Sequence, residues 1–219
     1  MKLFSIVLFL PILIAGLYTA IDSWLAHKTY ILDGTTVASI TRDVLHDPQY
    51  HTVDAMFDAA SARILAKIEA TGAVGLHDAP WFFINAGGWM GSFKVLYASL
   101  SEYVLLFGTA MPTSGHSGRY WAHIEDTLIS GNFTQWIEGG TQAKHWGAGD
   151  TVAHPKWAAT GVAWGADTWM VEYARGAIAT TMPFALGDGM LSSQDWYTVA
   201  RVLVLYARVV LANAIRGIF

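Results

Sequence analysis

Glu172 lies in an apolar part of the sequence, where an acidic residue is unexpected. It belongs to the run DTWMVEYARG at residues 167–176, whose composition predicts a strand. Side chains alternate across a strand, so Glu172 shares a face with Met170 and is turned away from Tyr173. A carboxylate without a partner is costly to remove from water, so it takes up a proton or pairs with a cation. We therefore expect Glu172 to be neutral, paired or functional.

A second acid, Asp126, occurs in a similar setting in the run WAHIEDTLISG at residues 121–131. Alternation groups it with Ile124 and Leu128 on an apolar face. Two carboxyl groups that point into one interior compete for ionisation, because like charges in close contact cannot both form at low cost. Asp126 and Glu172 are therefore candidates for a pair that shares one proton, exchanges it with a substrate, or holds one ammonium ion.

Both acids also admit a purely structural interpretation. A backbone N–H group, or an arginine such as Arg119 or Arg175, can satisfy a carboxylate on a strand without any ligand. Structural ion pairs of this kind also perturb pKa values, so an acid on an apolar face is not by itself a functional site.

Glu102 is the acid that we expect to be structural. It lies in the run SEYVLLFGTA at residues 101–110, where alternation turns it away from Tyr103, Leu105 and Phe107. Those three residues form a candidate lining face for a ligand. On the opposite face, a buried Glu102 is expected to accept hydrogen bonds from the N–H groups of a neighbouring segment.

Other kinds of chemistry have no support in the sequence. The histidines have neither H-x-H nor H-E-x-x-H spacing, which makes a metal site improbable, and no G-x-G-x-x-G or G-x-S-x-G motif occurs. We expect no bound metal and no cofactor. The chain contains no cysteine, which excludes disulfides and thiolate chemistry. The candidate metal ligands are scattered along the chain: His116, His123, His145 and His154.

Composition indicates association with a membrane. Of the 219 residues, 53% are hydrophobic and 14% are charged, which is too apolar for an ordinary soluble enzyme of this length. No charged residue occurs from Leu3 to Ile21, and this stretch predicts a transmembrane anchor. A cleaved signal peptide is the alternative. The net charge of -4, without a local cluster of Lys and Arg, argues against a nucleic-acid partner.

The rest of the chain divides into segments that differ in periodicity and composition. Helical periodicity predicts two helices, over 37–45 and 53–68, separated by Asp47-Pro48. Short aromatic and β-branched runs with Gly turns predict a closed β-barrel or sandwich from about residue 81 to 190. We expect a helix from about Ser193 to the end, capped by Ser192 or Ser193, lying over the barrel and in the membrane interface.

Five long motifs occur in the second half of the chain and in the part just before it. They are NAGGWMG at 85–91, ASLSEYVLLFGTA at 98–110, SGHSGRYWA at 114–122, DTLISG at 126–131 and TWMVEY at 168–173. These motifs resemble the family of the sigma-1 receptor and the fungal sterol C8 isomerases, with the closer likeness to the receptor. The resemblance implies an endoplasmic-reticulum membrane protein with one N-terminal anchor and a homotrimeric assembly. It also implies an α+β fold with a cupin-like β-barrel around an apolar ligand, flanked by helices, and C-terminal helices lying on the membrane.

Combined with the changes of periodicity and composition along the chain, the resemblance gives expected domain boundaries. They are a transmembrane anchor at 1–25, a helical cover at 26–80, the ligand-binding barrel at 81–190 and membrane-associated C-terminal helices at 191–219.

The resemblance also assigns roles to single residues. Glu172 is similar to the acid that pairs with the basic amine of a ligand, Asp126 to the acid hydrogen-bonded to it, and Tyr103 to the phenol that orients Glu172. The implied apolar lining is Ile84, Trp89, Phe93, Leu105, Phe107, Ile124, Trp164, Met170, Thr181, Met182, Ala185 and Tyr206.

Two functions fit these residues. One is a receptor-like protein that binds a sterol-like or cationic amphiphilic ligand, with membrane lipid as a further partner. The alternative is an isomerase in which Glu172 and Asp126 are catalytic and move the C8 double bond of a sterol to C7 by acid/base catalysis. An ammonium ion imitates the carbocation of that reaction, so the same pocket suits both functions.

Overall fold

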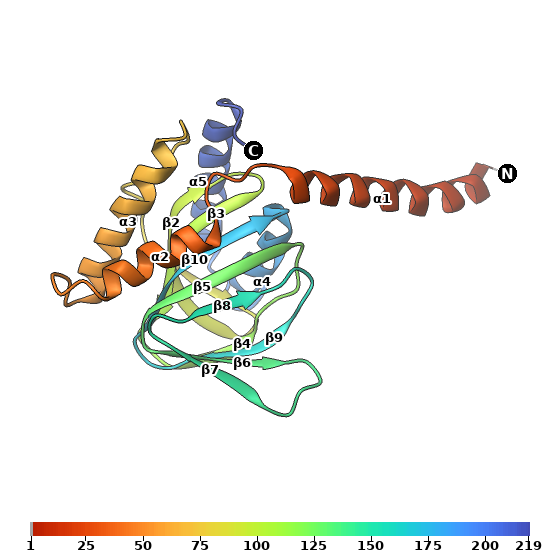
Figure 1. Cartoon of the computed structure of the whole chain (residues 1–219). Helices are drawn as coiled ribbons and strands as arrows, with labels where there is room; N and C mark the ends of the chain where they lie inside the picture. The colour runs from red at the N-terminus through yellow and green to blue at the C-terminus, as the bar shows by residue number, and fades with distance from the viewer. Residues whose placement is uncertain (1) are drawn as a thin grey trace. The chain divides into compact units, whose positions relative to one another are not determined.

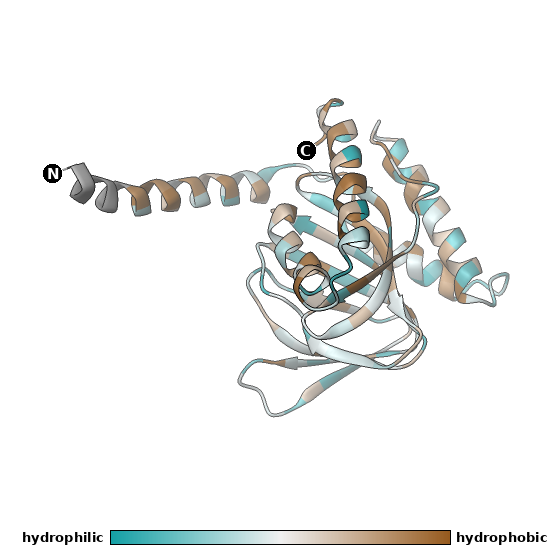
Figure 2. Cartoon of the chain, turned by 180° about the vertical axis from the view of Figure 1, so that it is seen from behind, coloured by the Kyte–Doolittle hydropathy of each residue, from teal (hydrophilic) through white to brown (hydrophobic). Residues whose placement is uncertain are grey.

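The computed structural model describes residues 2–219, with side chains from residue 10, and the chain forms two compact units, 1–30 and 31–219. The first unit contains one long helix, α1 (Lys2–His27), whose described side chains are mostly hydrophobic (Figure 2). By length and composition alone, Leu10–His27 of α1 is apolar enough to cross a membrane, and so is α5 (Trp196–Ala214) of the second unit.

The second unit is α+β and contains two antiparallel sheets. The six-stranded sheet has the order β1-β2-β3-β10-β5-β8, and the four-stranded sheet has the order β4-β9-β6-β7. A double-sheet jelly roll, the form that cupins have, is built from two such sheets. The strands are β1 (Phe82–Ala86), β2 (Trp89–Ala98), β3 (Glu102–Thr109), β4 (Thr113–His116), β5 (Ala122–Ser130), β6 (Asn132–Ile137), β7 (Ala143–Gly147), β8 (Thr151–His154), β9 (Thr160–Trp164) and β10 (Thr168–Gly176).

A two-residue turn at Gly87 and Gly88 connects β1 to β2 and contacts β4 of the other sheet. Ala86 pairs with Trp89, and both glycines have positive φ, +57° and +91°, the conformation of a tight hairpin turn that favours glycine. The carbonyl of Gly87 accepts a hydrogen bond of 2.9 Å from the N–H of His116 at the end of β4. A Cβ atom on Gly87 would lie 2.4 Å from the His116 carbonyl oxygen, so glycine also permits this close approach.

Two helices cover the outer face of the six-stranded sheet, as predicted (Figure 1). They are α2 (Gly34–Leu45) and α3 (Val53–Glu69), and their N-caps, Asp33 and Thr52, accept hydrogen bonds from N–H groups of the first turn. Their apolar faces pack against the outward side chains of the sheet, including Val171. One face of β10 therefore belongs to this helix-covered core, and its other face is left for the interior between the sheets.

The C-terminal region differs from the single helix that we expected. A short 3-10 turn, η1 (Ile178–Thr181), leads into α4 (Met182–Leu191), which occupies residues that the sequence assigned to the β region. The expected β region was extended along the chain to about Gly189, so it included most of the residues that form α4. The α5 helix begins only at Trp196 with Asp195, not Ser192 or Ser193, as N-cap, because Gln194 has a φ of +55° that separates the two helices.

The segment that follows the first unit is fixed to the outer face of the sheet by Glu102. Its carboxyl oxygens accept hydrogen bonds of 3.0 and 2.9 Å from the N–H groups of Ile31 and Leu32, and its side chain is 1% exposed. The hydroxyl of Tyr173 lies 2.8 Å from the Leu32 carbonyl and 3.0 Å from Glu102 Oε1. Glu102 therefore satisfies two backbone donors that would otherwise be buried without an acceptor.

Glu102→Ala is expected to lower the free energy of unfolding by about 2–4 kcal/mol, because each buried donor left without an acceptor costs about 1–3 kcal/mol. Denaturant titration monitored by tryptophan fluorescence measures the change. Tyr173→Phe, which removes only the hydroxyl, is the graded control and is expected to cost about 1 kcal/mol. Equal stability of Glu102→Ala and the wild type would show that the segment is held by other contacts.

Candidate functional site

The two acids singled out from the sequence face each other across adjacent strands. Glu172 on β10 pairs in register with Asp126 on β5, and β10 also pairs with β3, which carries Tyr103. Side chains of register partners on one face lie about 4.5–5.5 Å apart at Cβ. Together with the inward-facing residues of both sheets, these three side chains line a single cavity.

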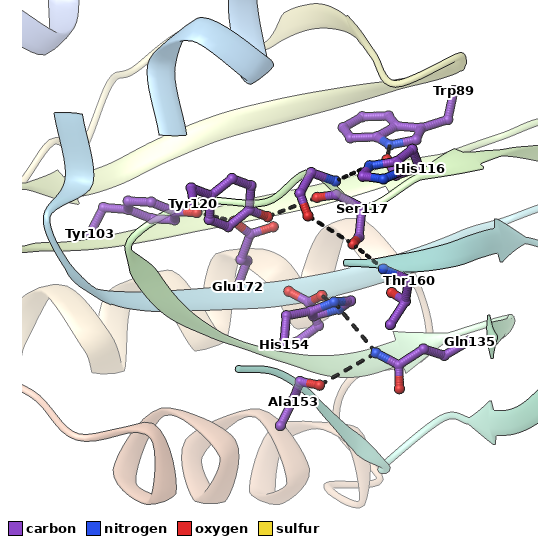
Figure 3. Close-up of polar contacts among 12 residues, drawn as sticks. Trp89, Tyr103, His116, Ser117, Tyr120, Gln135, Ala153, His154, Thr160 and Glu172 are labelled. Atoms are coloured by element: carbon purple, nitrogen blue, oxygen red, sulfur yellow. Dashed lines mark hydrogen bonds and ion pairs between the residues drawn. The ribbon is translucent and has the colours of Figure 1, made fainter. Parts of the chain in front are cut away.

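Two phenols lie beside Glu172 (Figure 3). The hydroxyl of Tyr103 donates a hydrogen bond to Glu172 Oε1, and the hydroxyl of Tyr120 donates one of 2.9 Å to the carbonyl of Ser117. Burial, and then the charge of Glu172, raise the pKa of Tyr103 and of Tyr120 well above the usual value of a phenol. Both hydroxyl groups therefore stay protonated and act as hydrogen-bond donors.

Glu172 itself favours the protonated form. Burial, and then the nearby charge of Asp126, raise the pKa of the Glu172 carboxyl well above its usual value, while the hydrogen bond from Tyr103 acts in the opposite direction. The side chain of Glu172 is only partly buried, and it lines the cavity. A cation that enters the cavity would meet this carboxyl group first.

Asp126 is more deeply buried and has a partner that the sequence did not predict. Its side chain is 6% exposed, and its Oδ2 lies 3.1 Å from His154 Nε2 on the neighbouring strand β8. Its other oxygen, Oδ1, is buried without a hydrogen-bond partner among the described residues. An unpaired buried oxygen next to Glu172 is an acceptor for a proton carried by that residue.

The ring of His154 is oriented by Gln135 from the other sheet (Figure 3). The amide nitrogen of Gln135 lies 3.4 Å from the carbonyl of Ala153 and 3.5 Å from His154 Nδ1. His154 therefore lies between the Gln135 amide and the Asp126 carboxyl, and it connects the acid pair to the four-stranded sheet.

The structure brings the residues assigned from the sequence to the cavity, with one exception. Met170 does not line it but is fully buried in the cluster that contains Phe107 and Trp164, whose rings reach the cavity instead. The residues that reach it as expected are Glu172, Asp126, Tyr103, Ile84, Trp89, Phe93, Leu105, Phe107, Ile124, Trp164, Thr181, Met182, Ala185 and Tyr206.

The cavity has a volume of about 150 Å³ and is mostly apolar away from the acids. An apolar cavity of this volume holds a ring the size of benzene, so a ligand of several rings would have to widen the cavity or extend out of it. Sequence reasoning missed ten further lining residues, because no motif or spacing marks them; they come from β2, β8, β9, η1, α4, α5 and the loop before β5. They are Val95, Ala98, Ser117, Tyr120, His154, Val162, Ile178, Phe184, Leu186 and Val202.

Neither arginine proposed as a structural partner reaches the acids. Arg119 NH2 pairs with Glu138 at 2.7 Å on the surface, and Arg175 is exposed on the outward face of β10. No Lys or Arg is present among the described residues that line the cavity. Across residues 2–219, no group of three His, Asp or Glu side chains is placed to hold a metal ion. An arginine partner for the acid pair is therefore excluded within the described structure.

Comparison with known proteins identifies the family. The model of the family described as "ERG2 and Sigma1 receptor like protein" matches residues 7–218. This chain belongs to that family. The chain is 42% identical over 204 residues to "Sigma non-opioid intracellular receptor 1" of Xenopus tropicalis, covering 90% of this chain and 89% of the relative. It is 44% identical over 192 residues to the protein of the same name from Taricha granulosa, covering 86% and 82%.

The ERG2 branch of the family is more distant. "Protein erg2 homolog" of Dictyostelium discoideum is 37% identical over 115 residues, which is 52% of this chain and 49% of the relative. Among solved structures, an RmlC-like cupin from Shewanella frigidimarina overlaps 48% of this chain and 89% of its own at 12% identity and a TM-score of 0.39. An overlap of that size carries no information about a ligand or a reaction. The sequence likeness therefore places the chain nearer to the sigma receptors than to the ERG2 homologue.

Proposed function

We propose that this chain is a receptor-like binding protein for hydrophobic amines and sterol-like molecules, which occupy the cavity and engage Glu172. The observation that carries the proposal is a pair of acids at one side of an otherwise apolar cavity whose described lining contains no Lys or Arg. A ligand with one ammonium group and an apolar body supplies both missing partners, a counter-charge and apolar contacts.

In this proposal each polar residue of the cavity has a different role. Glu172 pairs with the ammonium group, because its carboxyl is the one open to the cavity. The hydroxyl of Tyr103 donates a hydrogen bond to Glu172 Oε1 and fixes the orientation of that carboxyl. Asp126, with Oδ1 free, accepts the proton that Glu172 gives up when the cation arrives. The pair then keeps one negative charge, which matches one cation.

The membrane placement is also a proposal. Relatives named intracellular receptors, and two helices apolar enough to cross a membrane, support a location in the endoplasmic-reticulum membrane with α1 as single-pass anchor. Hydrophobic residues are prominent along α4 and α5 (Figure 2), and exposed ones on α5 include Leu203, Val204 and Leu211. We propose that these helices lie against membrane lipid and that the protein forms a homotrimer, as the family resemblance implies.

A second candidate function is the sterol C8 isomerase of the ERG2 branch. It is favoured by the different environments of the two acids. The pKa of the Glu172 carboxyl is raised, whereas Asp126 lies 3.1 Å from His154 Nε2. Two carboxyl groups with unlike environments are suited to serve as the general acid and the general base of a double-bond shift.

The proposed function predicts selectivity for charge at constant shape. N-(4-phenylbutyl)piperidine is expected to bind the purified full-length chain about 10- to 100-fold more tightly than 4-phenylbutylcyclohexane, its neutral isostere, since a charge-assisted hydrogen bond contributes about 1.5–3 kcal/mol. Competition binding in detergent micelles measures both affinities. Equal affinities would mean that the acids do not contact the ligand, and binding of neither compound would remove the proposed function.

A further inference from the structure

Strand β6 begins with an acceptor sequence for N-linked glycans. Asn132, Phe133 and Thr134 form Asn-X-Thr with X other than Pro, and no other Asn-X-Ser or Asn-X-Thr sequence occurs in the chain. Sequence alone leaves open whether such a site is hidden inside a β domain. The structure answers that question from the burial of the three side chains.

The two residues that define the acceptor sequence face outward. Phe133 is fully buried in the core between the sheets, so Asn132 and Thr134, one residue to either side, lie on the opposite face of β6. The exposure pattern agrees, with Asn132 exposed and Thr134 partly exposed. Asn132 directly follows Gly131, whose φ of +74° makes the turn between β5 and β6. The site is thus at the end of a strand, beside a turn.

The amide group of Asn132 is available while its backbone is fixed. The N–H of Asn132 donates to Thr168 Oγ1 at 3.1 Å, and its carbonyl accepts from the same hydroxyl at 3.0 Å. The side-chain amide lies near Gly165, where a Cβ atom would come within 2.6 Å of Nδ2. Substitution of one Nδ2 hydrogen would therefore leave the backbone hydrogen bonds of this turn in place.

We propose that Asn132 is a glycan acceptor and that the four-stranded sheet faces the lumen of the secretory pathway. In the transfer, the Nδ2–H bond of Asn132 breaks and a bond forms from Nδ2 to C1 of the sugar. The sugar leaves a lipid-linked oligosaccharyl diphosphate, and the released proton balances the diphosphate leaving group. This inference rests on the membrane placement proposed above and is independent of the ligand.

The fold also indicates when the transfer takes place. In the folded protein the hydroxyl of Thr134 lies 3.0 Å from His145 Nδ1 on β7, the strand that pairs with β6. Strand β7 follows β6 in the sequence, so the hydroxyl is unpaired until β7 has been synthesised and the hairpin closes. The acceptor is therefore most accessible during synthesis, before the four-stranded sheet is complete.

The test expresses the full chain in a eukaryotic secretory system and compares its mobility before and after peptide-N-glycosidase treatment. We expect the wild type to carry one enzyme-sensitive glycan, Asn132→Gln and Thr134→Ala to lose it completely, and Thr134→Ser to keep it. Mass spectrometry after the enzyme should find aspartate at position 132. An unfolding temperature of Asn132→Gln equal to that of the enzyme-treated wild type checks that the unglycosylated chain is folded, and it does so without reference to the proposed function.

The chain offers a matched control at the next turn. Gly139→Asn places an acceptor sequence before Thr141, at an exposed residue with a φ of +78° and open space around its Cβ position. If the Gly139→Asn variant carried a glycan and the wild type did not, the proposal would be overturned. The sheet would then face the lumen, but Asn132 would not be an acceptor. Absence of a glycan from both proteins would overturn it as well, because neither turn would have met the transferase.

Discussion

Glu172→Gln is expected to reduce the affinity for hydrophobic amines by at least about 100-fold. The substitution keeps the shape of the side chain and removes the negative charge, so the ammonium group would be buried in the cavity without its contacting anion. Removing one partner of a buried ion pair costs about 3–5 kcal/mol, which corresponds to this loss in affinity. Asp126 does not replace it, because its side chain is only 6% exposed and its Oδ2 is engaged by His154 Nε2 at 3.1 Å. Radioligand or calorimetric titration measures the effect.

Two companion variants separate this effect from loss of folding. Glu125→Gln makes the same chemical change one residue from Asp126, on the outward face of β5 where Glu125 pairs with His123 at 3.0 Å, and amine affinity should not change. Tyr103→Phe removes the donor to Glu172 and should weaken binding by about tenfold. Undiminished affinity in Glu172→Gln, with unfolding temperature equal to that of the wild type, would contradict the central role of this acid.

Asp126→Asn is expected to weaken amine binding by about 10- to 100-fold and to stop any sterol conversion that the wild type performs. The asparagine cannot take the proton of Glu172, so Glu172 would have to lose it to solvent before pairing with an ammonium ion, at a cost of about 1.5–3 kcal/mol. In an isomerase the same change removes the group that completes the proton transfer. Amine titration and sterol analysis in cells lacking sterol C8 isomerase measure the two effects separately.

The wild type in those cells decides between the two candidate functions. Accumulation of C8-unsaturated sterols alone, in cells that contain folded protein able to bind amines, would leave the receptor-like function and remove the isomerase. Conversion of the sterols by the wild type, and its loss in Asp126→Asn, would establish catalysis by the acid pair. Amine affinity unchanged in Asp126→Asn would instead mean that Asp126 is structural and that Glu172 acts without it.

His154 links these two predictions to the rest of the fold. Its Nε2 lies 3.1 Å from Asp126 Oδ2 on the neighbouring strand, and the Gln135 amide of β6 contacts its ring from the opposite sheet. The buried acid pair is therefore connected to both sheets through His154 and Gln135. Polar contacts of this kind lower the cost of burying a carboxyl group.

Local sequence pattern was sufficient for much of the architecture. Helical periodicity predicted α2 and α3, because amphipathic helices of this length carry a clear 3.6-residue repeat. Alternation predicted that Glu172 and Asp126 would face one interior and Tyr173 and Ile129 the other, because the two-residue repeat of a strand is a local property. The lining residues came from the family resemblance, which composition and spacing would not have provided.

The pattern was insufficient where neighbouring residues along the chain compete for the same role. Glycines in α4 have the same appearance in the sequence as glycines in turns, and Ser192, Ser193 and Asp195 all suit an N-cap before α5. Asp195 becomes the cap because Ser192 and Ser193 follow α4 directly, and their N–H groups donate to the carbonyl of Asp188 in that helix. The choice depends on how two helices meet, and local propensity contains no information about that.

The sequence by itself determined which side chains point inward, and the tertiary structure decided which of them meet. Glu172, Asp126 and His154 lie on strands β10, β5 and β8, and their contacts depend on strand order and register. His154 appeared to be an isolated histidine because no fixed spacing connects it to Asp126. Pairing between strands far apart in the chain is set by the packing of the whole core, so only the folded protein assembles the site.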